Sequence, residues 1–199
     1  MGEIEHHPWE PFLPENTRIL FLGSFPPARK RWCMDFFYPN YTNDFWRIFG
    51  ICLYGDKMRF VDEANKTFRF KEILNELEQH GVGLYDTAIE VIRTKQTASD
   101  KDLEVVTPTD LSALLRRVPQ CSVVVTTGQK ATDLFTAHFS IPQPKVGDFV
   151  EFDFEGRPMR LYRMPSSSRA YPMKVEKKAE YYENLPLTPT PPLDPDTSP

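Results

Sequence analysis

Short apolar runs, separated by polar and amphipathic stretches, form the main pattern along this chain. Residues 19–22, 82–85 and 121–126 are apolar or valine-rich runs. Each has the length of a strand, and the lack of regular polar alternation indicates burial on both faces, as in a parallel sheet. Residues 149–154 and 159–164 instead alternate between polar and apolar positions around a Glu-Gly pair, which predicts a hairpin.

Amphipathic stretches between these runs predict helices. Residues 62–80 repeat apolar side chains at helical spacing, and Gly81 is expected to end that helix. Asn43 or Thr42 is placed to cap a helix over residues 43–49. The other predicted helices follow a cap at Thr109, begin after Gly128, and span residues 171–184.

The order of these elements predicts the fold and its limits. Strands that alternate with helices indicate a three-layer α/β/α domain with a short, mostly parallel central sheet. We expect this domain to span residues 17–184. Residues 1–16 are predicted to be a polar N-terminal extension that wraps the surface, and residues 95–108 a loop. Residues 185–199 are proline-rich with few apolar side chains, which predicts a disordered tail.

Polar or flexible residues follow each strand that is predicted to be parallel. Because the carboxyl ends of parallel strands meet at one edge of a sheet, these residues are expected to line a single cleft. They are Gly23 and Ser24, then Asp86, then Thr127 and Gly128, and finally Pro165 and Ser166.

Composition narrows the class of protein and its compartment. The 199 residues, 40% hydrophobic and 13% aromatic, suit one globular domain. No apolar run approaches the length of a membrane span, and the N-terminus lacks the pattern of a signal peptide. The three cysteines are scattered, and neither they nor the four histidines have the spacing of metal ligands. We therefore expect a cytoplasmic monomer with no membrane partner, no metal and no cofactor.

The net charge of −4 argues against a general nucleic-acid binder, but the charges are unevenly distributed. Residues 16–59 hold seven Lys and Arg against three Asp and Glu, and residues 155–178 hold seven against two. One basic face of this kind can bind DNA weakly and with strong salt dependence. The alternative is that these charges are ordinary solvated surface.

Aromatic and cationic side chains are concentrated in the same basic region. Flat rings beside positive charges suit a planar base and its phosphates. Packing in the hydrophobic core is the alternative for the aromatic rings. The residues are Arg29, Lys30, Arg31, Phe36, Phe37, Tyr38, Tyr41, Phe45 and Trp46.

These segments resemble a known family, the uracil-DNA glycosylase superfamily. Its first motif is similar to Gly23-Ser-Phe-Pro26, Phe36-Phe-Tyr-Pro39 and Asn43-Asp-Phe-Trp-Arg47, and its second motif to Met164-Pro-Ser-Ser-Ser-Arg-Ala170. The resemblance covers roughly residues 17–184. It is closest to the hypoxanthine/uracil DNA glycosylase branch, near the mismatch-specific enzymes.

The resemblance implies a fold and an activity. The fold is the α/β/α sandwich of that superfamily. The activity is that of a monofunctional glycosylase in base excision repair. Such an enzyme flips a uracil or hypoxanthine out of double- or single-stranded DNA, hydrolyses its N-glycosidic bond and leaves an abasic site.

The resemblance also assigns a catalytic residue. Asn43 matches the asparagine on which the hypoxanthine branch relies, and it would orient water or hydrogen-bond the base. Compared with the motif of that branch, two extra residues lie between Pro39 and Asn43, so Asn40 remains an alternative. Phe25 stands where the best-known enzymes carry an Asp and the mismatch branch an Asn. Met164 stands where the best-known enzymes carry a His.

Binding roles follow from the same motifs. Phe36 would stack on the base, with a core phenylalanine as the alternative. Asp86 would accept an N–H of the base, with a turn or helix cap as the alternative. The predicted base pocket comprises Gly23, Ser24, Phe25, Phe36 and Asp86. The predicted DNA contacts are Arg47, Pro165, Ser166, Ser167, Ser168 and Arg169.

Two other functions remain open from the sequence. Without an Asp or His at the positions of Phe25 and Met164, the chain could be a catalytically silent module that binds damaged DNA. It could also be a hydrolase of small nucleotides. No glycine-rich phosphate loop with lysine and no Ser-His-Asp pattern supports the latter.

Overall fold

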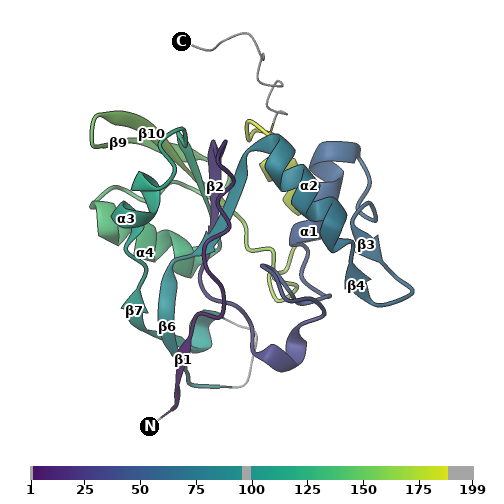
Figure 1. The fold of residues 1–199 in the computed structure, drawn as a ribbon. Helices are drawn as coiled ribbons and strands as arrows, with labels where there is room; N and C mark the ends of the chain where they lie inside the picture. The colour runs from purple at the N-terminus through teal and green to yellow at the C-terminus, as the bar shows by residue number, and fades with distance from the viewer. Residues whose placement is uncertain (1, 96–99, 188–199) are drawn as a thin grey trace.

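A five-stranded sheet forms the centre of the computed structural model, which describes residues 2–95 and 100–187 (Figure 1). Its strand order is β5-β2-β8-β10-β9. Strands β2 (Ile19–Gly23), β5 (Val82–Asp86), β8 (Val123–Thr127) and β10 (Arg157–Met164) run parallel, and β9 (Phe149–Phe154) is antiparallel at one edge. The apolar runs and the predicted hairpin therefore form one sheet.

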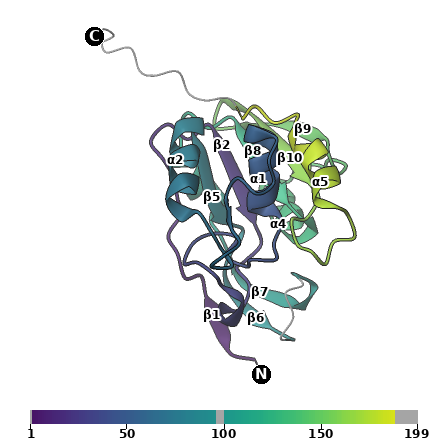
Figure 2. The same ribbon diagram turned by 90° about the vertical axis from the view of Figure 1, so that its right-hand side faces the viewer.

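Helices cover both faces of this sheet. One face carries α1 (Phe45–Tyr54), α2 (Phe70–His80) and α5 (Val175–Tyr182), and the other carries α3 (Leu111–Arg116) and α4 (Gln129–Phe139), as Figures 1 and 2 show. Every residue of β2, β5 and β8 is buried, as expected for strands covered on both faces. The predicted three-layer α/β/α fold is confirmed. No helix in the described ranges is long and apolar enough to cross a membrane.

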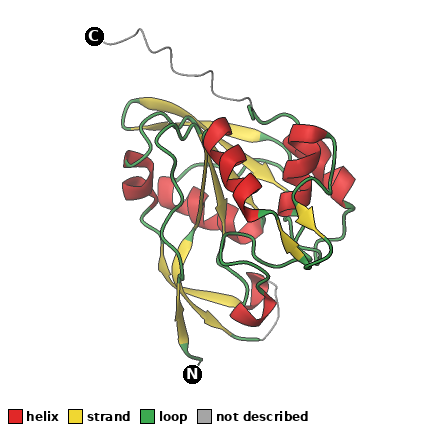
Figure 3. Ribbon diagram, turned by 45° about the vertical axis from the view of Figure 1, so that its right-hand side comes forward, coloured by secondary structure: helices red, strands yellow, loops and turns green. Residues whose placement is uncertain are grey.

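Two smaller sheets were not predicted. An antiparallel sheet of β1 (Ile4–His6), β6 (Ala88–Arg93) and β7 (Leu103–Pro108) projects from one end of the molecule (Figure 3). Strands β3 (Val61–Asp62) and β4 (Thr67–Phe68) form a short hairpin.

These sheets correct two predictions. Residues 103–108 form a strand and not a loop: they pair with β6, and Leu103, Val105 and Thr107 alternate with more exposed positions. The predicted helix over residues 62–80 begins only at Phe70, because the β3–β4 hairpin occupies its first part. Residues 96–99 of the predicted loop, and residues 188–199 of the predicted tail, lie outside the described residues.

The N-terminal segment is hydrogen-bonded to the rest of the domain. Strand β1 pairs with β6, and Phe12 exchanges two backbone hydrogen bonds with Leu84 of β5, at 3.0 and 2.8 Å. These bonds cover the free edge of β5, which would otherwise expose unpaired backbone groups. They also bring His7, between β1 and Phe12, against the end of β5.

The helix caps differ from the predicted ones by one residue. The N-cap of α1 is Asp44, and the side chain of Asn43 accepts a hydrogen bond from the Phe45 amide at 2.8 Å, just before the helix. The N-cap of α3 is Asp110, whose carboxylate accepts from the Ala113 amide at 2.9 Å. The hydroxyl of Thr109, the predicted cap, donates instead to the backbone oxygen of Asp86 at 2.7 Å.

Candidate functional site

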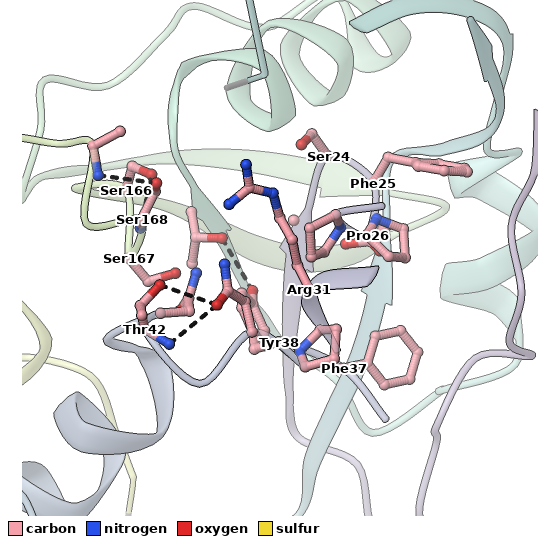
Figure 4. A pocket seen from close by; sticks show the side chains of 18 of the residues that line it. Ser24, Phe25, Pro26, Arg31, Phe37, Tyr38, Thr42, Ser166, Ser167 and Ser168 are labelled. Carbon is pink, nitrogen blue, oxygen red and sulfur yellow. Dashed lines mark hydrogen bonds between the residues drawn. The ribbon is translucent and has the colours of Figure 1, made fainter. Parts of the chain in front are cut away.

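The parallel strands end together at one edge of the sheet, where they surround a cavity of about 270 Å³ (Figure 4). Gly23 of β2 lies opposite Asp86 of β5, and Thr127 of β8 lies opposite Met164 of β10. The volume is just below the roughly 300–1,000 Å³ of sites for drug-sized ligands, so the cavity suits a single planar base.

Most of the predicted site residues line this cavity. They are Gly23, Ser24, Phe25, Asn43, Asp86, Ser166, Ser167, Ser168 and Arg169, and the alternative residue Asn40 lines it too. Phe36, Arg47 and Pro165 do not belong to its lining. Pro165 lies in a neighbouring cavity of about 570 Å³ on the other side of the serines.

Phe36 belongs to the hydrophobic core. Its side chain packs against the rings of Phe12, Phe70 and Trp46 at centroid distances of 5.1 to 6.2 Å, and the residue is 8% exposed. Because Phe36 packs in this way and does not line the cavity, the structure places it in the core and not where a base would stack. The next residue, Phe37, lines the cavity instead (Figure 4).

Arg47 is a buried support and not a surface cation. Its guanidinium donates hydrogen bonds to the backbone oxygens of Tyr41 at 2.8 Å and Asn43 at 3.0 Å. Burial, followed by the nearby charge of Arg169, lowers the pKa of Arg47. The structure therefore contradicts the predicted DNA contact, and the side chain holds the loop that carries Asn43.

Tyr38, which the sequence analysis names among the aromatic residues but not among the site residues, forms a wall of the cavity. Its ring stacks on Phe45 at 3.7 Å between centroids, and its hydroxyl shares a hydrogen bond of 3.0 Å with Thr127. Its φ of 52° lies in the left-handed region, which is uncommon for a residue with a side chain. This conformation turns the ring toward the end of β8.

The two candidate catalytic amides use their oxygens within the loop. The Oδ1 atom of Asn43 accepts from the Phe45 amide, and that of Asn40 accepts from the amide and hydroxyl of Thr42 at 3.1 and 3.0 Å. Within the described residues, neither NH₂ group makes a hydrogen bond. Each can therefore donate to a ligand or to water in the cavity.

A buried ionic cluster joins the serine loop, residues 166–169, to the start of α1. Asp44 is 3% exposed, and its two oxygens lie 2.9 Å from Nε of Arg169 and 3.0 Å from Nζ of Lys178. Lys178, in α5, is fully buried and also donates to the backbone oxygen of Ser168 at 2.7 Å. The Asp44 amide donates to Ser167 at 2.9 Å. No sequence pattern links these residues.

Asp86 lies at the floor of the cavity, between β2 and the N-terminal segment. Its Oδ2 atom is 2.9 Å from Nε2 of His7. Its Oδ1 atom lies over Gly23, where a Cβ atom would come within 2.5 Å of it. Only glycine leaves room for the carboxylate at this position of β2. His7 was missed by sequence reasoning because its only visible signal was a histidine in a polar segment.

Two of the arginines in the lining of the cavity are Arg31 and Arg93. Arg31 is exposed, and Figure 4 shows its side chain projecting between Ser24 and the serines. Arg93 donates to the backbone oxygen of Pro26 at 2.6 Å and pairs with Glu5 at 2.9 Å. Within the described ranges, no three His, Cys, Asp or Glu side chains are placed to hold a metal ion.

Comparison with known proteins supports the fold. No family model and no curated protein matches the sequence. The structure is similar to a solution NMR structure from Methanosarcina acetivorans described as a "putative Uracil DNA glycosylase", with a TM-score of 0.61 and 23% identity over 92% of this chain and 96% of that one. The chain thus has the fold of that protein, which is the fold that the resemblance of its two motifs implied.

Proposed function

We propose that the protein is a monofunctional DNA glycosylase that removes uracil or hypoxanthine from double- or single-stranded DNA. One observation carries the proposal: both motif regions, more than a hundred residues apart, line one cavity of the size of a base. The similar protein from Methanosarcina acetivorans, by its description, supports the same activity. The chemistry is hydrolysis of the N-glycosidic bond of a flipped nucleotide.

In this proposal the flipped base lies between the aromatic and polar walls of the cavity. Phe37 and Tyr38 form the aromatic wall, and the carboxylate of Asp86 accepts an N–H of the base. The transition state has positive charge on the sugar and negative charge on the departing base. Donors and cations near the base therefore accelerate bond cleavage, and Arg31 is an exposed cation in the lining of the cavity.

Asn43 would act through its NH₂ group. An amide cannot take a proton from water at neutral pH, so its role is to orient water or to donate to the base. The oxygen is already held by the Phe45 amide, which fixes the direction of the NH₂ group. A donor fixed before the reaction stabilises developing charge without reorganisation.

The serine loop would hold the opened DNA. Its hydroxyls and backbone amides suit phosphates, and Arg169, beside the cavity, would fill the space left by the flipped nucleotide. The Asp44–Lys178 pair holds this loop against α1 in the absence of DNA.

The proposal is tested by single-turnover excision on oligonucleotides that each carry uracil, hypoxanthine, xanthine or a G:T mismatch, followed by alkali. Asn43→Ala should lower the excision rate about a hundredfold, or about 3 kcal/mol, with little change in DNA affinity. Asn65→Ala, in an exposed turn of the β3–β4 hairpin, is the matched control.

The contrary results are equally specific. If Asn43 only supports the turn before α1, the variant should lose about 1 kcal/mol of stability and excise at nearly the wild-type rate. That outcome would move the catalytic assignment to Asn40 or Asp86.

A silent DNA-binding module is the second candidate, and the environment of two residues favours it. Phe25 lines the cavity without a group that can polarise water, and Met164 is fully buried and does not line it. A wild-type protein that binds lesion-containing DNA but excises none of the bases would establish this function instead.

A further inference from the structure

We propose that His7 is a positioning residue that holds Asp86 as a hydrogen-bond acceptor and so selects bases with an N–H at the pairing edge. This inference rests on the proposed function, because it concerns the base that enters the same cavity. It assigns a role in base selection to the N-terminal segment, which lies outside both sequence motifs.

The contact between the two residues is short and enclosed. Nε2 of His7 lies 2.9 Å from Oδ2 of Asp86, and their side chains are 3% and 10% exposed. Aromatic rings surround the imidazole: Trp9, Phe25, Phe37 and Tyr85 lie at centroid distances of 4.8 to 6.1 Å. The imidazole therefore cannot swing away from the carboxylate without displacing these rings.

The hydrogen-bond partners determine where the proton lies. An ionised carboxylate only accepts, so Nε2 must carry the hydrogen. The other ring nitrogen, Nδ1, lies 2.8 Å from the backbone oxygen of Trp9 and 3.2 Å from its amide nitrogen. A protonated Nδ1 donates to that oxygen, and a bare Nδ1 accepts from that amide. His7 can thus donate from Nε2 to Asp86 whether the ring is neutral or charged.

The second oxygen of Asp86 lies beside the cavity. Oδ1 lies over Gly23 on the lining of the cavity, and within the described residues nothing donates a hydrogen bond to it. It is an acceptor that a ligand can satisfy. When the hydrogen between the two side chains belongs to Nε2 of His7, an ionised Asp86 presents only an acceptor to the cavity.

This polarity separates two classes of base. Uracil and hypoxanthine each present a ring N–H at the pairing edge, which can donate to Oδ1. Cytosine and adenine present a bare ring nitrogen there, so two acceptors would face each other without a hydrogen. A site built to bond an N–H rejects the analogue that lacks it, because the buried polar group stays unpaired.

Without His7 the selection should weaken. The carboxylate would lose the donor that holds its Oδ2 atom, so the side chain could turn and Oδ1 would no longer be fixed toward the base. An acceptor that is no longer held in one direction discriminates less between a base with a ring N–H and one without it, so cytosine would be excluded less strongly.

The test compares the affinities of the wild type, His7→Ala and His7→Gln for oligonucleotides with one 2′-fluoro-deoxyuridine or 2′-fluoro-deoxycytidine. The fluorine opposes positive charge on the sugar, so the base stays attached during the measurement. His6→Ala is the matched control, because the side chain of His6 is 74% exposed and pairs only with Glu90 among the described residues. Single-turnover excision of uracil and the melting temperature are measured on the same proteins.

We expect His7→Ala to lower the preference for uracil over cytosine at least tenfold, and His6→Ala to leave it unchanged. His7→Gln should recover most of the preference, because the glutamine NH₂ can donate to Asp86. An unchanged preference in His7→Ala, or a glutamine variant as deficient as the alanine variant at equal melting temperature, would overturn the inference.

Two further outcomes separate this inference from the proposed function. If the wild type excises no base but its uracil preference still depends on His7, the inference stands and the enzyme activity fails. If the wild type excises uracil and its preference does not depend on His7, the proposed function stands and this inference fails. Should His7→Ala not fold, nitrogen-15 NMR of the wild-type imidazole decides, since a ring without a hydrogen on Nε2 contradicts the proposal.

Discussion

Two buried aspartates at the same edge of the sheet, Asp44 and Asp86, have opposite relations to their surroundings. Both oxygens of Asp44 are occupied, by Arg169 and by the fully buried Lys178. Among the described residues, only one oxygen of Asp86 has a hydrogen-bond partner, His7, and the other lies over Gly23 beside the cavity. A fully paired buried charge holds segments together, whereas a half-paired one keeps an acceptor for a ligand.

The difference follows from where the partners come from. Asp44 is the N-cap of α1, and its cationic partners come from the serine loop and from α5. The ionic cluster therefore holds these three segments together. Asp86 ends β5, and its partner His7 comes from the N-terminal segment and is not part of the cavity lining. We therefore expect changes at Asp44 to act on stability and changes at Asp86 to act on base recognition.

The largest expected effect is a loss of folding stability in the Asp44→Asn variant. The substitution removes the charge that pairs with Lys178 and leaves a fully buried ammonium uncompensated. Loss of one partner of a buried pair typically costs about 3–5 kcal/mol. Urea denaturation should show this loss, while Asp148→Asn, at an exposed position, should stay within about 0.5 kcal/mol of wild type. A stable Asp44→Asn protein would break the comparison.

The second effect is on excision by Asp86→Asn. The asparagine oxygen can take the hydrogen bond from His7, which turns the NH₂ group toward the base and replaces the acceptor by a donor. Uracil excision should fall about a hundredfold, or about 3 kcal/mol, with a stability loss near 1 kcal/mol. Single-turnover rates and unfolding curves on the same protein measure both. Equal stability losses in Asp86→Asn and Asp44→Asn would show that the two carboxylates do not differ in role.

The smallest expected effect is the loss of stability in Arg169→Gln, which tests the exposed member of the Asp44 cluster. Its side chain is 57% exposed, so its ion pair with Asp44 should contribute at most about 1 kcal/mol to stability. If Arg169 also meets a phosphate, the slope of DNA affinity against salt concentration should fall by about one counterion. DNA titrations at several salt concentrations test this. An unchanged slope would show that Arg169 only pairs with Asp44 and does not contact a phosphate.

The sequence by itself determined the central sheet and where its strands end. Strands buried on both faces must be apolar throughout, so β2, β5 and β8 were visible as local runs. The residues just after those runs had to meet at one edge, which placed Gly23, Ser24 and the serines around one cavity. Strand β7 was not predicted because polar and apolar residues do not alternate strictly along it. A half-exposed strand of that composition resembles a loop.

Tertiary structure alone decided which side chains face the cavity and what holds them there. Phe36 and Phe37 are neighbours in an irregular loop, where no periodicity tells which ring enters the core. His7 and Asp86 are 79 positions apart, and Asp44 and Lys178 are 134 apart. A single histidine or lysine carries no local sign of such a partner, because the low dielectric that makes these pairs matter exists only once the chain has folded.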